Sequence, residues 1–181
     1  MQASRTDNNL ILELGLLEKQ VLLHIFTSVI SNYRLKPEEM HPKVAAAWYS
    51  TRGCKSAGMT AEETGEWIES LREYKSANLA LLEKWVTAMS EKPADPFILK
   101  LPVEQAHVLL SIINDHRLLA AAESEIGDEE MELHSLNEFE ELPADKQAAL
   151  YEIHFLAWLM EEILRLAAPE AASWNAARDN T

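Results

Sequence analysis

Polar side chains interrupt the apolar faces of three predicted helices, and their types could serve a binding or catalytic site. Because an α-helix turns by about 100° per residue, Lys75 and Asn78 fall within one apolar face, His116 within a second and Glu152 within a third. An unpaired buried charge is costly, whereas a paired and hydrogen-bonded one is tolerated. We therefore expect these side chains to meet one another inside the protein.

The expected contacts centre on Lys75, which we predict to pair with a carboxylate from another helix, Glu152 or Asp115. His116 and Asn78 would complete the network. Two interpretations stay open: a polar core that fixes the register of the helices, or a ligand or catalytic pocket, since perturbed ionisable groups mark sites in only some proteins. The candidate residues are Lys75, Asn78, Asp115, His116, Arg117 and Glu152.

Motifs for metal binding and catalysis are weak. Glu104 and His107 have the Glu-x-x-His spacing of di-metal carboxylate bundles, but His107 lies on the polar side of its predicted helix. The five glycines form no phosphate-cradling loop, and no nucleophile with a neighbouring base can be named. We expect no metal, no cofactor and no catalytic residue.

The elements that must position these residues are helices. Apolar residues recur at helical spacing in four segments. The first covers residues 16–33, the third begins at Leu101 and the fourth covers residues 143–167. The second begins at Thr60, which forms a capping box with Glu63, and ends near residue 90. A shorter helix is predicted near residues 44–49. The alternating segments Leu10–Leu14 and Phe97–Leu101 predict a small two-stranded ribbon. The fold class is mainly α: a single-domain bundle of about five helices over residues 1–168, followed by a frayed tail at 169–181.

Composition restricts the partners of the chain. A formal net charge of −14 over 181 residues would repel nucleic acid and anionic membranes. The longest apolar run is too short to cross a bilayer, the polar start has no secretory signal, and the single Cys54 cannot form an internal disulfide, so we expect a cytoplasmic protein. Residues 118–145 hold ten acidic residues and no Lys or Arg. A solvated acidic connection explains this segment more simply than a docking patch for a basic protein.

The last predicted helix has more apolar surface than one core requires. Tyr151, Phe155 and Trp158 recur at i, i+4 and i+7, opposite the face assigned to the bundle. Either the chain covers this stripe itself or a second copy does. Stripes of aromatic residues are typical of interfaces, and two-fold pairs are the commonest oligomers, so we predict a homodimer.

Three segments resemble an uncharacterised bacterial family, mainly actinobacterial, known only as a domain of unknown function. They are "LREYKSANLALLEKW" (71–85), "INDHRLL" (113–119) and "FLAWLMEEILRL" (155–166). This chain has Ala121, Ala122 and Glu123 where the family usually has Gly-Thr-Arg. The resemblance implies a helical fold over residues 10–166 and, because such genes often neighbour that of the ClpS protease adaptor, a link to regulated proteolysis.

These observations favour a non-enzymatic helical interaction or regulatory protein. Its acidity, the lack of catalytic motifs and the surplus apolar stripe all point this way. The alternative is a small-molecule- or metal-binding helical enzyme built around Lys75, Asp115, His116 and Glu152.

Overall fold

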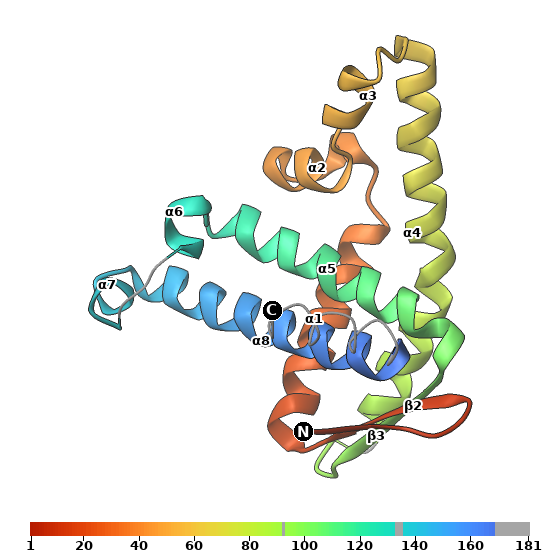
Figure 1. Cartoon of the computed structure of the whole chain (residues 1–181), viewed down its shortest axis with the longest axis vertical. Coiled ribbons are helices and arrows are strands. Elements are labelled where there is room, and N and C mark those ends of the chain that lie inside the picture. The colour runs from red at the N-terminus through yellow and green to blue at the C-terminus, as the bar shows by residue number, and fades with distance from the viewer. Residues whose placement is uncertain (92, 133–135, 169–181) are drawn as a thin grey trace, which may run out of the picture.

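The computed structural model describes residues 1–91, 93–132 and 136–168, with the side chains of 136 and 137 excepted. The tail predicted at 169–181 lies outside these residues. The described chain is mainly helical, as the sequence predicts, and four long helices make up most of it (Figure 1). They are α1 (Leu16–Tyr33), α4 (Ala61–Ser90), α5 (Ala106–Glu123) and α8 (Ala144–Ala167).

Shorter elements connect the long helices. Between α1 and α4 lie the 3₁₀ turn η1 (Pro37–Glu39), α2 (Pro42–Trp48), which is the short helix predicted there, and α3 (Arg52–Ser56). The 3₁₀ turn η2 (Val103–Gln105) precedes α5, and α6 (Asp128–Met131) and α7 (Leu136–Glu140) precede α8. No helix in the described ranges is long and apolar enough to span a membrane.

The predicted ribbon is present and gains a third strand. β2 (Asn9–Leu14) pairs antiparallel with β3 (Phe97–Pro102), with Leu12 opposite Leu99. β1 (Gln2–Arg5) pairs with the other edge of β2 and was not predicted, because its sequence is polar and lacks alternation. The ladder also corrects the start of the next helix: residue 101 pairs within the sheet, so α5 begins at Ala106 rather than at 101.

Helix α5 lies at the centre of the helical part. It runs beside α8 along one side and packs against α1 and α2 on the other (Figure 1), while α1 also packs against α4. Leucines of β2 and β3 and the apolar residues of α1, α5 and α8 share one buried core. Because α5 touches three other helices, two adjacent polar residues on different sides of it, Asp115 and His116, are both buried.

Helix α4 begins as predicted but packs over only part of its length. The Thr60 hydroxyl accepts a hydrogen bond from the Glu63 amide at 3.2 Å, and the Glu63 carboxylate accepts one from the Thr60 amide at 2.7 Å. The side chains of Trp67 and Tyr74, in the first half of the helix, are exposed at 44% and 42%. The buried residues of α4 lie between Lys75 and Met89, and Figure 1 shows the start of the helix projecting away from α5 and α8.

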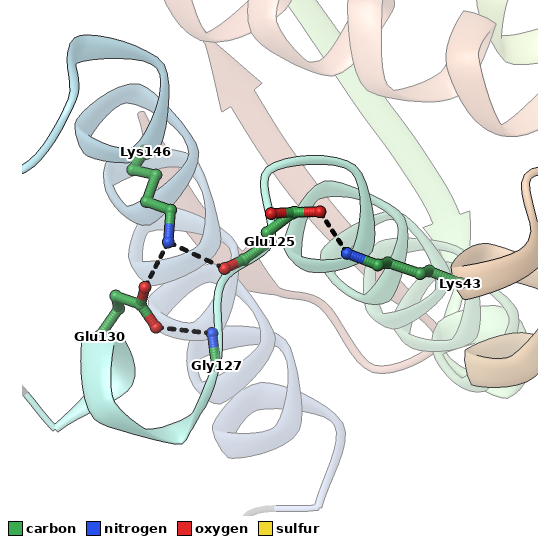
Figure 2. A network of polar contacts seen from close by, with 5 residues as sticks. All are labelled: Lys43, Glu125, Gly127, Glu130 and Lys146. Carbon is green, nitrogen blue, oxygen red and sulfur yellow. Dashed lines mark hydrogen bonds and ion pairs between the residues drawn. The ribbon is translucent and has the colours of Figure 1, made fainter.

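The first part of the acidic connection between α5 and α8 is held by two lysines (Figure 2). Lys146 donates to a carboxylate oxygen of Glu130 and, at 3.0 Å, to the main-chain carbonyl of Glu125. The Glu125 carboxylate pairs with Lys43 of α2. Glu125 also ends α5 in a left-handed conformation with φ 52°, and the amide of Ile126 bonds the carbonyl of Ala121 at 2.9 Å, which forms a Schellman cap. At least these two acidic residues therefore serve the fold.

The Glu130 carboxylate should make the stability of this connection depend on pH. The hydrogen bond from Lys146, followed by that from the Gly127 amide, lowers the pKa of Glu130 from 4.5 to about 2. A pKa that is lower in the folded state contributes stability above the unfolded value and loses it as the pH falls towards the folded one. We expect Glu130→Gln to lower the melting temperature at pH 7, with the difference from wild type shrinking below pH 4.5 and vanishing near pH 2.

Thermal unfolding followed by circular dichroism measures this difference. The exposed neighbour Glu129 provides the matched control, because Glu129→Gln removes an equal charge from the same short helix. A gap between Glu130→Gln and wild type that is the same at acid and neutral pH would contradict the prediction.

Candidate functional site

Lys75 meets one of the two carboxylates expected from the sequence, that of Asp115. Its ammonium lies 2.6 Å from Oδ2 of Asp115, and the hydroxyl of Tyr33 donates to the same oxygen at 2.6 Å. The indole N–H of Trp48 donates to the main-chain carbonyl of Asp115 at 2.8 Å. Residues of α1, α2 and α4 thus converge on one residue of α5.

Aromatic rings enclose the ammonium of Lys75. It lies 4.8 Å from the centroid of the Trp48 ring and 5.6 Å from that of Tyr33, within reach of cation–π attraction. The two rings contact each other edge to face, with centroids 5.4 Å apart. Lys75 and Asp115 are only 6% and 5% exposed. This pair is closed to substrates in the structure as it stands.

The charge of Asp115 acts on the tyrosines around it. Burial raises the pKa of Tyr33 far above its usual value, and the neighbouring Asp115 charge raises it further. Burial and then Asp115 also raise the pKa of Tyr49. Both hydroxyls therefore keep their protons at neutral pH, where Tyr33 acts as a hydrogen-bond donor to Asp115. The cluster is suited to holding four helices in register.

His116, the next residue along α5, forms a second pair on another side of the helix. Its Nε2 lies 2.7 Å from Oε1 of Glu152 on α8, and its ring contacts that of His24 on α1 edge to face at 6.4 Å. His116 is 4% exposed, and its Nδ1 has no hydrogen-bond partner in the described part of the chain. The hydrogen bond from His116 lowers the pKa of Glu152 against the opposing effect of burial. Glu152 is therefore ionised at neutral pH.

The single network expected from the sequence is thus divided into two pairs. Asn78 is buried, but its amide nitrogen has no partner among the described residues. Arg117 reaches the sulfur of Met160 at 3.6 Å instead of joining either pair. Sequence reasoning missed Tyr33, whose ring fits an apolar helix face and whose hydroxyl gives no signal of its own. It also missed Lys19, which is buried on α1 and donates to the Asp95 carbonyl at 2.9 Å.

The weak metal candidates Glu104 and His107 contact each other within one helical turn. Nδ1 of His107 lies 2.6 Å from the main-chain carbonyl of Glu104, at an exposed position. Within residues 1–91, 93–132 and 136–168, no group of three or more His, Cys, Asp or Glu side chains could hold a metal ion.

A groove of about 610 Å³ lies between α1 and α8, and the second ion pair opens into it. Its apolar walls are Leu17 and Val21 of α1 and Tyr151 and Phe155 of α8. Its polar lining includes Glu18, His24 and Glu152. This groove is therefore where an ionisable group of the predicted set, Glu152, meets space that a ligand could fill.

The aromatic residues of α8 continue from the groove as an exposed stripe, which we define as Tyr151, Phe155 and Trp158. Tyr151 and Trp158 are 66% and 46% exposed. The ring of Phe139 contacts that of Tyr151 at 4.8 Å, and Phe155 contacts Trp158 at 6.0 Å. No part of the chain that the structure describes buries the two outer rings.

Comparison with known proteins identifies a family whose description names no activity. Residues 57–167 match the family described as Domain of unknown function (DUF2017). Neither curated proteins nor solved structures gave a match to this chain. The matched range includes Lys75, Asp115, His116, Glu152 and the aromatic stripe, whereas Tyr33, Trp48 and the α1 wall of the groove precede it.

Removing Asp115 should lower the free energy of unfolding more than removing Lys75 does. Asp115→Ala leaves an ammonium buried without its carboxylate and removes the acceptor of Tyr33, which should cost about 3–5 kcal/mol of unfolding free energy. Lys75→Met keeps the volume and leaves Asp115 with the Tyr33 hydroxyl and free to take up a proton, so its cost should be clearly smaller. Urea unfolding followed by circular dichroism measures both.

Tyr33→Phe provides the matched control, because it removes one hydrogen bond to the same oxygen and should cost about 1.5–3 kcal/mol. Equal and negligible losses for Lys75→Met and Asp115→Ala would show that the pair does not hold the helices together.

Proposed function

Since the chain belongs to the DUF2017 family, whose description gives no activity, we propose its function from its surfaces: it is a non-enzymatic helical interaction protein that self-associates through α8. The observation that carries this proposal is the aromatic stripe, whose outer members Tyr151 and Trp158 are 66% and 46% exposed. Exposed aromatic residues gathered on one helix face are typical of interfaces. The expectation of a homodimer rests on the same stripe.

The sequence of α8 supports an antiparallel pairing of two copies. Tyr151 and Arg165 each stand seven residues from Trp158, on opposite sides of it. A two-fold axis at Trp158 would set Arg165 of each copy beside the Tyr151 ring of the other, where a guanidinium gains cation–π attraction. His154 and Glu162, four residues to either side, would face each other in the same way.

The enzyme alternative has less support. It needs ionisable groups that a substrate can reach, and Lys75 and Asp115 are enclosed by Tyr33 and Trp48. The α1–α8 groove does favour binding of a small molecule. We propose no reaction for this chain.

Three further proposals concern the cellular compartment and the partners of the protein. A single buried cysteine, Cys54, suits a reducing cytoplasm. The charge of −14 disfavours nucleic acid. Exposed acids of the connection, such as Glu129 and Glu140, would suit a basic protein partner, and the resemblance to a family encoded near a protease adaptor makes proteins of regulated proteolysis the first to test.

Trp158→Glu should dissociate the proposed dimer, because it places a charge at the centre of the pairing. We expect the dissociation constant to rise by about 30-fold or more, as for a central aromatic interface residue, with the helix content unchanged. Trp67→Glu is the matched control, since Trp67 is a tryptophan of similar exposure, 44%, on α4. Sedimentation velocity over a range of concentrations measures the effect. A wild-type protein that stays at 20.5 kDa on concentrating would overturn self-association.

Arg165→Glu tests the antiparallel arrangement separately from self-association. Loss of an exposed cation–π contact should weaken the dimer by about fivefold per contact. Arg34→Glu, on the end of α1, changes the net charge equally and should leave the dimer as it is. A dimer that weakens with Trp158→Glu but not with Arg165→Glu would keep self-association and exclude this arrangement.

A further inference from the structure

The groove between α1 and α8 combines apolar walls with one ionised carboxylate. Leu17 and Val21 line it from α1, and Tyr151 and Phe155 line it from α8, next to Glu152. Its volume of about 610 Å³ lies within the range usual for small-molecule sites, roughly 300–1,000 Å³. We infer that this groove binds an amphipathic organic amine, with the apolar body between the walls and the protonated nitrogen at Glu152. The site goes beyond the proposed self-association and does not require it.

The walls are suited to the apolar part of such a ligand. Leu17 is 72% exposed, so a molecule in the groove would remove a large apolar surface from water. Tyr151 and Phe155 present rings from the other side, and aromatic rings attract cations as well as apolar groups. A neutral hydrocarbon would gain only the first of these effects.

The carboxylate of Glu152 has an acceptor left for the amine. Oε1 accepts the hydrogen bond from His116, and Oε2 makes no hydrogen bond in the described residues. The Glu152 side chain is 27% exposed, which leaves it within reach of the groove. Glu18, the other acid of the lining, has its charge balanced by the amino group of Met1 at 2.7 Å. We therefore expect a ligand cation to bind at Glu152.

The carboxylate of Glu152 is presented to the groove in its ionised form. The hydrogen bond from His116 lowers the pKa of Glu152 against the opposing effect of burial. The chain as a whole, at −14, also attracts cations towards the groove.

Three probes of one shape and different charge test this site: 2-phenylethylamine, 2-phenylethanol and phenylacetate. Amide and tryptophan N–H shifts in nuclear magnetic resonance titrations give the affinity and the location together. We expect the amine to bind with 1:1 stoichiometry and about tenfold more tightly than the alcohol, and phenylacetate to bind least. Equal binding of amine and alcohol, or a preference for phenylacetate, would overturn the inference.

Substitutions in the groove test whether the amine binds there. Glu152→Gln should remove the preference for the amine over the alcohol, while Glu161→Gln, at an exposed position on the same helix, should keep it. If Glu152→Gln does not fold, Leu17→Lys places a cation on the exposed wall and should abolish amine binding, whereas Leu164→Lys, at an exposed apolar position on α8, should not. Amine binding that survives both Glu152→Gln and Leu17→Lys would place it elsewhere and refute the site.

The same titration on Trp158→Glu separates this inference from the proposed function. That variant keeps every residue named in the groove, so amine binding should persist whether or not the wild-type protein self-associates. Loss of amine selectivity in Trp158→Glu with an intact fold would contradict a site centred on Glu152.

Discussion

The buried carboxylate of Asp115 is the constraint on which the arrangement of the helices depends. It lies on the central helix α5 and accepts hydrogen bonds from Tyr33 of α1 and Lys75 of α4 on a single oxygen. Its main-chain carbonyl accepts a third from Trp48 of α2. Because a buried charge without partners is strongly unfavourable, a helix that slid by one turn would lose more than packing. Apolar contacts alone tolerate such shifts far better.

The adjacent position on α5 extends this constraint to the opposite side of the molecule. Successive residues of a helix point about 100° apart, so fixing Asp115 towards α4 also fixes His116 towards α8 and His24. Glu152 then meets His116 at 2.7 Å, which sets the rotation of α8 about its axis. This rotation leaves Tyr151 and Trp158 on the outside, 66% and 46% exposed, so the contact between His116 and Glu152 also sets where the aromatic stripe lies.

Local sequence signals predicted the elements well. The capping box of Thr60 and Glu63, the alternation in β2 and β3, and the helical spacing in α1 and α8 act over a few residues, and the structure confirms all of them. The helical spacing also placed Lys75 on an apolar face and so indicated that it needs a partner. The spacing could not decide between Asp115 and Glu152, because the partner depends on which helices are neighbours in space. The polar strand β1 escaped prediction for the same reason, because it pairs only with β2 in space.

The distribution of charge between interior and surface bears on function. In the interior, Lys75 meets Asp115, and His116 meets Glu152, so most of the ionisable groups that first suggested chemistry are engaged in holding helices. In the connection before α8, Lys43 and Lys146 engage Glu125 and Glu130 (Figure 2). The surface of α8 and the groove beside it are not taken up by these contacts and are available for recognition.

Those two surfaces share Tyr151 and Phe155. In the proposed dimer one side of the Tyr151 ring would face Arg165 of a second copy, while another side lines the groove that would hold an amine. Two ligands that contact the same side chains change each other's affinity by equal factors, whichever binds first. An amine that ordered the Tyr151 ring in a conformation suited to the partner would strengthen the pairing, and one that displaced the ring would weaken it. Self-association and ligand binding through these surfaces would therefore be linked, with Tyr151 as the side chain through which the coupling acts.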